Sequence, residues 1–370
     1  MKSSPVPANS QAKVNLMGLD RRALENFFTG LGEKPFRARQ VLKWIHDRGV
    51  VDFGAMTDLS KALRERLSQL AEIPVLNEVR SQQSTDGTRK WLLELTDGNR
   101  IETVFIPEAR RGTLCVSSQV GCALNCAFCA TARQGFSRNL TAGEIVAQVW
   151  HARQMLGEGH ISNVVLMGMG EPLLNFDAVV SALDLMMDDL AYGFAKRRVT
   201  VSTAGLVPAI LRLGQESDAS LAVSLHATTD SLRDELVPIN RKYPLTQLME
   251  ACYEFIHLER QKGRKITWEY VMLDGINDSP EDARRLVKLL SKMPSKINLI
   301  PFNRFEGAPY RCTPPERIAR FQAILQAAGF LTTVRKTRGE DIDAACGQLV
   351  GKVQAKSRPR REFKLEAEVL

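Results

Sequence analysis

The chain has 370 residues, 44% of them hydrophobic, and a formal net charge of +8. This size predicts two domains, or one large α/β domain with an extension. No apolar run approaches the roughly 18 residues of a membrane helix, so we expect a cytoplasmic protein without a membrane partner. Seven cysteines, an odd number, indicate reduced thiols used in chemistry and argue against a secreted disulfide scaffold. The positive charge favours a polyanionic partner, although a basic enzyme without one explains it equally well.

Residues 1–77 predict a small, basic helical domain that assists RNA binding. Segments 21–32, 34–49 and 59–70 each carry helix-spaced apolar residues among lysines and arginines. Residues 89–107 form two β-rich runs around an Asp-Gly turn, which is typical of a hairpin. We therefore expect residues 78–112 to be a β-hairpin that links two domains.

From residue 113 onward, β-rich runs alternate with helical segments. The β-rich runs are 113–118, 161–168, 197–203, 220–227, 265–273 and 295–302. The helical segments are 141–156, 175–187, 245–259, 279–291 and 313–329. This α/β alternation predicts a partial (β/α)6 barrel over residues 113–350, with its chemistry on loops at the carboxyl ends of the strands. An open doubly wound sheet is the alternative, and a basic tail at 351–370 is expected to be disordered.

Three cysteines, Cys122, Cys126 and Cys129, follow the first of these strands at C-x3-C-x2-C spacing, with no fourth thiol close behind. Thiolates suit iron–sulfur clusters, and three of them leave one iron of a [4Fe–4S] cluster free to bind another molecule. This spacing, with Phe128 between the last two cysteines, resembles the signature of the radical S-adenosylmethionine (SAM) superfamily, in which SAM chelates the open iron. The alternative is a zinc site completed by a distant Cys or His.

Small and polar residues close the later strands of the expected barrel. Gly170, Glu171 and Pro172 resemble the SAM-contacting Gly-Glu-Pro segment of that superfamily, and Glu171 is suited to accept hydrogen bonds from an ammonium group. The remaining candidate SAM-binding residues are Ser202, Ser224, Leu225, His226 and Asn303. A lone histidine is usually structural, and His226 is included because its neighbours converge on the same edge.

The match to one family extends from about residue 19 to residue 351. The segments "RGTLCVSSQVGCALNCAFCATARQGFSRNLTAGEI", "MGMGEPLLN", "SLHA", "PINRKYPL" and "RGEDIDAACGQL" resemble the RlmN-type radical SAM adenine carbon-2 methyltransferases, which act on ribosomal and transfer RNA. The resemblance implies that Cys346 carries a methyl group, that Cys115 resolves a covalent intermediate, and that Glu102 accepts a proton. Without the resemblance, Glu102 would be interpreted as a solvated residue of a hairpin.

The resemblance also implies a reaction that consumes two SAM molecules per turnover. One SAM methylates Cys346, and the second yields a radical that removes hydrogen from that methyl group. The resulting methylene radical adds to the adenine, and Cys115 attacks the sulfur of Cys346, leaving a transient disulfide. The implied partners are 23S rRNA, certain tRNAs, an external electron donor and a disulfide reductant. We expect the protein to be a monomer.

Two other functions fit parts of the sequence. A relative that methylates carbon-8 of the same adenosine and confers antibiotic resistance shares the cluster, the loop cysteine and the fold. A non-catalytic RNA-binding protein with a structural metal site explains the charge and the three thiols, but gives Cys346 no task. Cys252 and Cys312 have no matched role and are interpreted as structural, and the basic run 196–198 is expected to contact phosphates.

Overall fold

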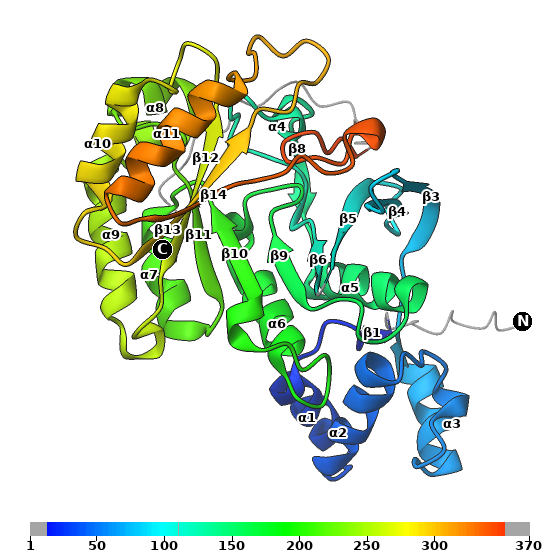
Figure 1. Cartoon of the computed structure of the whole chain (residues 1–370). Helices are drawn as coiled ribbons and strands as arrows, with labels where there is room; N and C mark the ends of the chain where they lie inside the picture. The colour runs from blue at the N-terminus through cyan, green and yellow to red at the C-terminus, as the bar shows by residue number, and fades with distance from the viewer. Residues whose placement is uncertain (1–12, 110, 352–370) are drawn as a thin grey trace, which may run out of the picture.

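The N-terminal part of the chain is a small helical unit. The computed structural model describes residues 13–109 and 111–351, so the basic tail expected at 351–370 lies almost wholly outside the described residues (Figure 1). The elements of this unit are β1 (Val14–Asn15), α1 (Arg21–Gly30), α2 (Phe36–Leu42), α3 (Lys61–Leu70) and β2 (Ala71–Glu72). The side chains of Asp20 and Ser60 cap α1 and α3 by accepting backbone N–H bonds. The parallel pairing of β1 with β2 brings the two ends of the unit together.

One sheet of ten strands runs through the rest of the described chain. Its order is β14-β13-β12-β11-β10-β9-β6-β5-β4-β3. The strands are β3 (Asn77–Gln83), β4 (Arg89–Glu94), β5 (Arg100–Glu108), β6 (Arg111–Cys115), β9 (Asn163–Leu166), β10 (Val199–Thr203), β11 (Ser220–Ser224), β12 (Ile266–Met272), β13 (Ser295–Pro301) and β14 (Leu331–Val334). From β6 to β14 the neighbours are parallel and follow chain order, whereas a doubly wound sheet reverses its order at a switch point. This order confirms the partial barrel and excludes the doubly wound alternative.

Helices connect the parallel strands. They are α5 (Ala142–Leu156), α6 (Phe176–Met187), α7 (Val207–Glu216), α8 (Asp230–Leu236), α9 (Leu245–His257), α10 (Pro280–Leu290) and α11 (Pro315–Ala327). In Figure 1, α7, α9, α10 and α11 lie along one side of the curved sheet. A short hairpin, β7 (Gln119–Gly121) and β8 (Phe136–Asn139), encloses α4 (Ala130–Arg133) in the loop after β6. Among the described residues, no helix is both long and apolar enough to cross a bilayer.

The structure adds elements that the sequence pattern did not indicate. The expected hairpin is formed by β4 and β5, but β5 also pairs with β6, so residues 78–112 continue the main sheet. The strands β3 and β14 and the helices α7 and α8 were not predicted. Strand β14 has only 4 residues, and its Leu331 is 56% exposed, so it lacks the buried apolar alternation of a recognisable strand.

A buried glutamine joins α5 to the strand that precedes the three cysteines. Gln148 Oε1 accepts hydrogen bonds from Thr103 Oγ1 and the Ser117 N–H, both at 2.8 Å, and Gln148 Nε2 donates to the Ser117 carbonyl at 2.9 Å. Its side chain is fully buried, so its removal leaves these groups without partners.

We predict that Gln148→Ala lowers the free energy of unfolding by roughly 1–3 kcal/mol, because buried polar groups lose their hydrogen bonds. Urea denaturation followed by circular dichroism measures the change. Gln154→Ala is the matched control, since Gln154 lies on the exposed face of the same helix. Equal stability of the two variants would contradict this account of Gln148.

Candidate active site

A cavity of about 170 Å³ lies at the carboxyl edge of the parallel strands. Its lining includes these residues predicted from the sequence: Cys122, Cys126, Cys129, Gly170, Glu171, Pro172, Ser202, Ser224, His226, Asn303 and Cys346. We call it the first cavity. Leu225 is the predicted SAM contact that does not line it, and its side chain is fully buried. Residues from six separate loops therefore meet in one place.

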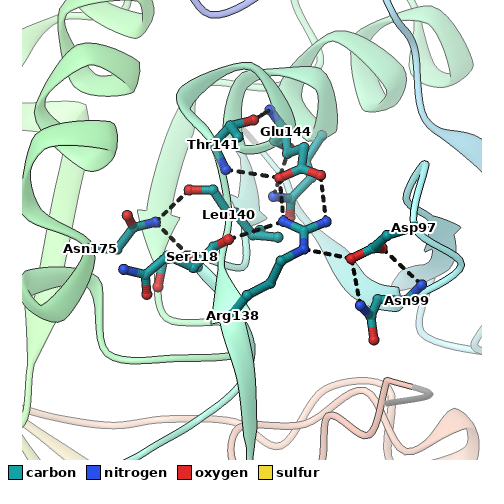
Figure 2. Close-up of polar contacts among 10 residues, drawn as sticks. Asp97, Asn99, Ser118, Arg138, Leu140, Thr141, Glu144 and Asn175 are labelled. Carbon is teal, nitrogen blue, oxygen red and sulfur yellow. Dashed lines mark hydrogen bonds and ion pairs between the residues drawn. The ribbon is translucent and has the colours of Figure 1, made fainter. Parts of the chain in front are cut away.

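The loop that carries the three cysteines is held firmly at its base. Figure 2 shows Arg138 of β8 between Asp97 and Glu144, with Arg138 Nε 2.6 Å from Asp97 Oδ2 and both terminal nitrogens 2.8 Å from the Glu144 carboxylate. The same glutamate caps α5 by accepting from the Thr141 N–H. At the same base of the hairpin, Asn175 Nδ2 donates to the carbonyls of Ser118 and Leu140 at 2.8 and 2.7 Å.

The three cysteines of the loop all line the first cavity. Burial raises the pKa of Cys122 to about 12 and raises that of Cys126 well above its ordinary value, and the Cys129 thiol adds to both shifts. A metal removes the proton from a coordinating thiol, so buried thiols of this kind suit a metal-bound state.

The three thiols are a set of soft donors that line one cavity. Three thiolates leave one iron of a [4Fe–4S] cluster open, whereas a structural zinc ion takes four protein ligands. The donor set therefore fits the cluster.

The segment after β9 is built for close approach. Gly170 has φ +102°, and a Cβ there would lie 2.5 Å from the Cβ of Gln119, so this position requires glycine. The carboxylate of Glu171 accepts the N–H groups of Leu173 at 3.1 Å and Ala204 at 2.8 Å. Burial raises the pKa of Glu171 to about 7. Glu171 thus joins the β9 and β10 loops while its carboxylate lines the first cavity.

His226 has a fixed tautomer. It adopts φ +61° after β11, and its Nδ1 accepts the Val271 N–H at 3.0 Å, which leaves the proton on Nε2. Burial lowers the pKa of His226 to about 3, so the ring stays neutral. The ring of Phe128 packs edge-on against it with centroids 4.5 Å apart. The histidine thereby connects the cysteine loop with the end of β11.

A fully buried arginine, which the sequence analysis did not single out, organises the ends of β10 and β11. Arg233 of α8 donates hydrogen bonds to the carbonyls of Ala204 at 2.6 Å, Ser224 at 3.1 Å and Leu225 at 3.1 Å, and to Asn240 Oδ1 at 2.9 Å. All four acceptors are neutral, and the salt bridges of the described chain do not include Arg233. The carbonyl of Leu225 therefore helps to position this edge, although its side chain does not reach the cavity.

Cys346 is brought into the first cavity by the segment that follows β14. The Gly347 carbonyl accepts the Ala130 N–H at 2.8 Å, and Asn303 Nδ2 donates to the Cys346 carbonyl at 3.2 Å. Figure 1 shows this segment, in red, beside α4 and β8. Contacts to the cysteine loop and to the end of β13 thus set the position of Cys346.

A second, larger cavity of about 610 Å³ lies within the curve of the sheet. Both Cys115 and Cys346 line it, whereas Cys115 does not line the first cavity. The wall that both cavities share consists of Met167, Glu269, Ile300, Pro301, Asn303, Arg335 and Cys346. Cys346 is therefore accessible from both cavities.

The thiol of Cys115 is protonated in this state. Burial, followed by the charge of Cys346, raises the pKa of Cys115 to about 12, and the positive charge of Arg335 opposes this shift. Cys115 and Cys346 are both free thiols. Cys115 can therefore act as a nucleophile only after a proton is removed.

Glu102 is placed differently from the other predicted site residues. It is only 5% exposed, so it is not a solvated hairpin residue, yet it lines neither cavity. Its Oε1 is 3.1 Å from Lys90 Nζ, and its Oε2 accepts the Val350 N–H at 2.7 Å. The carboxylate therefore anchors the segment that carries Cys346.

The two charged residues of the shared wall, Glu269 and Arg335, were missed in the sequence. Glu269 interrupts the apolar run of β12, and an acid in such a strand was the available signal. Arg335 follows β14, and without that strand its place at the carboxyl edge could not be recognised. The run 196–198 precedes β10 and so lies at the opposite edge of the sheet, where Lys196 pairs with Asp218 at 2.8 Å.

Comparisons with known proteins agree with this architecture. Residues 14–73 match the family model of the ribosomal RNA large subunit methyltransferase N-terminal domain, and residues 116–287 match that of the radical SAM superfamily. A protein of Alkalilimnicola ehrlichii named dual-specificity RNA methyltransferase RlmN is 58% identical over 354 residues, which cover 95% of this chain and 97% of that protein. A protein of the same name from Marinobacter nauticus is 54% identical, over 95% of this chain and 96% of that protein.

A solved structure gives the same result in three dimensions. The crystal structure of a radical SAM methyltransferase from Sphaerobacter thermophilus superposes with a TM-score of 0.85 and is 45% identical, covering 91% of this chain and 99% of that one. Three cysteines with the spacing and environment of cluster ligands thus lie in a chain whose relatives share almost its whole length. The chain belongs to the RlmN family of radical SAM RNA methyltransferases.

Proposed function

We propose that the chain methylates carbon-2 of a specific adenosine in 23S rRNA, in the peptidyl-transferase region, and of an adenosine in certain tRNAs. The relatives named above are dual-specificity RNA methyltransferases, which supports both substrates. The observation that carries the proposal is the position of Cys346 in the wall between the two cavities. A group on this sulfur can face SAM on one side and RNA on the other.

Cys122, Cys126 and Cys129 would hold a [4Fe–4S] cluster, and the remaining residues of the first cavity would hold SAM. When bound, these cofactors supply a carbon radical that can remove hydrogen from an unactivated methyl group. Such chemistry is needed because carbon-2 of adenine is electron-poor and does not attack the SAM methyl group. Glu171 lines the cavity, and its carboxylate, which accepts two backbone N–H groups, has lone pairs left for the SAM ammonium group, while Gly170 lets the ligand approach the backbone closely.

Cys346 and Cys115 would perform the transfer. Cys346 takes a methyl group from one SAM and delivers it, after activation by a second SAM, to the base. Cys115 then attacks the Cys346 sulfur, releasing the product and forming a disulfide that an external reductant reopens. Burial raises the pKa of Cys115, so its thiol must lose a proton before this attack.

RNA would enter through the second cavity. Lys296 and Lys336 line this cavity and can contact phosphates, whereas Arg338, which also lines it, pairs with Asp86 at 3.7 Å. We place the protein in the cytoplasm, where RNA and thiol reductants occur, and we propose that it acts as a monomer with an external electron donor. The RNA-binding alternative without catalysis leaves the Cys346 arrangement unexplained.

We predict that the purified, cluster-reconstituted protein forms 2-methyladenosine in RNA, measured by liquid chromatography and mass spectrometry of nucleosides. Cys346→Ala should keep iron and SAM cleavage but lose RNA methylation, whereas Cys126→Ala should lose all three. Cys312→Ala is the control, since Cys312 is exposed and outside both cavities. Formation of 8-methyladenosine would favour the carbon-8 alternative, and methylation by Cys346→Ala would exclude the relay.

A second prediction concerns the resolving thiol. Cys115→Ala should still methylate Cys346 and still add it to the base, but should stall there because no thiol displaces the product. An RNase-sensitive, slowly migrating band on denaturing gels would report this protein–RNA adduct. The band should disappear in the Cys115→Ala, Cys346→Ala double variant. Normal turnover by Cys115→Ala without an adduct would return Cys115 to a packing role.

A third prediction separates two roles of Glu102, anchor and proton acceptor. Glu102→Gln keeps an oxygen for the Val350 N–H but loses the basic carboxylate, so methylation of Cys346 should persist while RNA product forms about 10²-fold more slowly. Mass spectrometry of the Cys346 peptide and of RNA measures the two steps. Glu94→Gln, on the neighbouring strand, is the control. A wild-type product rate in Glu102→Gln would remove the proton-acceptor role.

A further inference from the structure

One buried carboxylate of the shared wall is only half satisfied. Glu269 of β12 is 3% exposed, and its Oε1 accepts a hydrogen bond from Asn298 Nδ2 at 2.8 Å. Its Oε2 is buried without a hydrogen-bond partner among the described residues. An unpaired buried oxygen is costly to maintain, and this one lines both cavities. Such an oxygen is suited to receive a donor from a ligand.

A cation with unused donors lies next to it. Within the described chain, no hydrogen bond or salt bridge engages the guanidinium of Arg335, whose backbone N–H alone bonds to Leu299. Arg335 lines both cavities, as Glu269 and Cys346 do. Arg335 thus shares the lining of the second cavity with Glu269 and with both cysteines.

These groups match one edge of adenine. Along that edge, carbon-2 is followed by the acceptor N1 and then by the exocyclic amine on carbon-6. The second cavity presents both cysteines together with a donor, Arg335, and an acceptor, Glu269. A guanine would place a carbonyl oxygen, another acceptor, against the carboxylate.

We propose that Glu269 and Arg335 recognise the substrate adenine, with Glu269 Oε2 accepting from the exocyclic amine and Arg335 donating to N1. This inference rests on the function proposed above and names the residues that select the base. The adenosyl group of SAM carries the same chemistry, but the residues of the first cavity already provide for SAM. Only the second cavity holds Cys115, which must reach the sulfur of Cys346 while that sulfur is joined to the base.

The test uses two RNA substrates that differ at the target nucleotide, one with adenosine and one with purine riboside, which lacks the amine. Their kcat/KM values for methylation are compared in the wild type and in Glu269→Gln. Asn298 Nδ2 holds one oxygen of residue 269, so the glutamine turns its NH2 toward the base. A donor then faces the amine, and the preference for adenosine should fall about 10- to 100-fold.

Three controls make the outcome specific. Glu108→Gln, another acid of the second cavity, should keep the wild-type preference. Glu269→Met should also lose the preference, which guards against misfolding of the first variant. The Kd of S-adenosylhomocysteine, measured by calorimetry, should stay within about threefold in Glu269→Gln, whereas a large rise with an unchanged base preference would assign Glu269 to SAM and overturn the inference.

The two proposals fail in different ways. If the wild type methylates adenosine RNA and Glu269→Gln keeps the wild-type preference, base recognition by Glu269 is wrong while the function stands. If the wild type methylates neither RNA, the proposed function is wrong and the inference falls with it.

Discussion

The position of the Cys346 sulfur depends on the segment that follows β14. This segment returns from the β14 edge of the sheet to the strands on the other side of β6. Backbone groups of this segment bond to α4, where Thr131 Oγ1 donates to the Leu349 carbonyl at 2.8 Å. Others bond to the strands beyond β6, where Lys90 Nζ donates to the Asp343 carbonyl at 3.1 Å. The segment has little regular structure, so these contacts replace the hydrogen bonds that a helix or strand would provide. The fold therefore serves to fix both ends of a loop around its cysteine.

A buried positive charge also stabilises the carboxyl edge of the sheet, at the ends of β10 and β11. Arg233 is a fully buried cation whose hydrogen-bond acceptors are all neutral. Burial lowers the pKa of Arg233. Among the neighbouring thiols and acids, Cys126 opposes this lowering most. A buried charge requires a compensating one, and a thiolate-bound cluster supplies negative charge at this place. Arg233 thus links the positions of the ends of β10 and β11 to the charge of the site.

The site could be predicted best from the sequence where the spacing of residues along the chain determines their chemistry. The C-x3-C-x2-C run and the polar residues after the β-rich segments were expected at one edge, since parallel strands share that edge, and all of these candidates except Leu225 line the first cavity. Contacts between distant segments could not be predicted in this way. The burial of Glu102 depends on Val350 and Lys90, and no local pattern brings these residues together. Strand β14 is recognisable only through its pairing with β13. It could therefore not be predicted from the sequence that Arg335 lies in the wall shared by the two cavities.

The two cavities that meet at Cys346 have a kinetic consequence. Because the predicted SAM-binding residues line one cavity and Cys115 lines the other, the proposed donor and acceptor would reach the same sulfur from different sides. On the proposed relay, the chain can be loaded with its methyl group before any RNA arrives, and the spent donor can leave without crossing the RNA path. The protein then behaves as a precharged carrier with substituted-enzyme kinetics, in which the first half-reaction proceeds at a rate independent of RNA concentration.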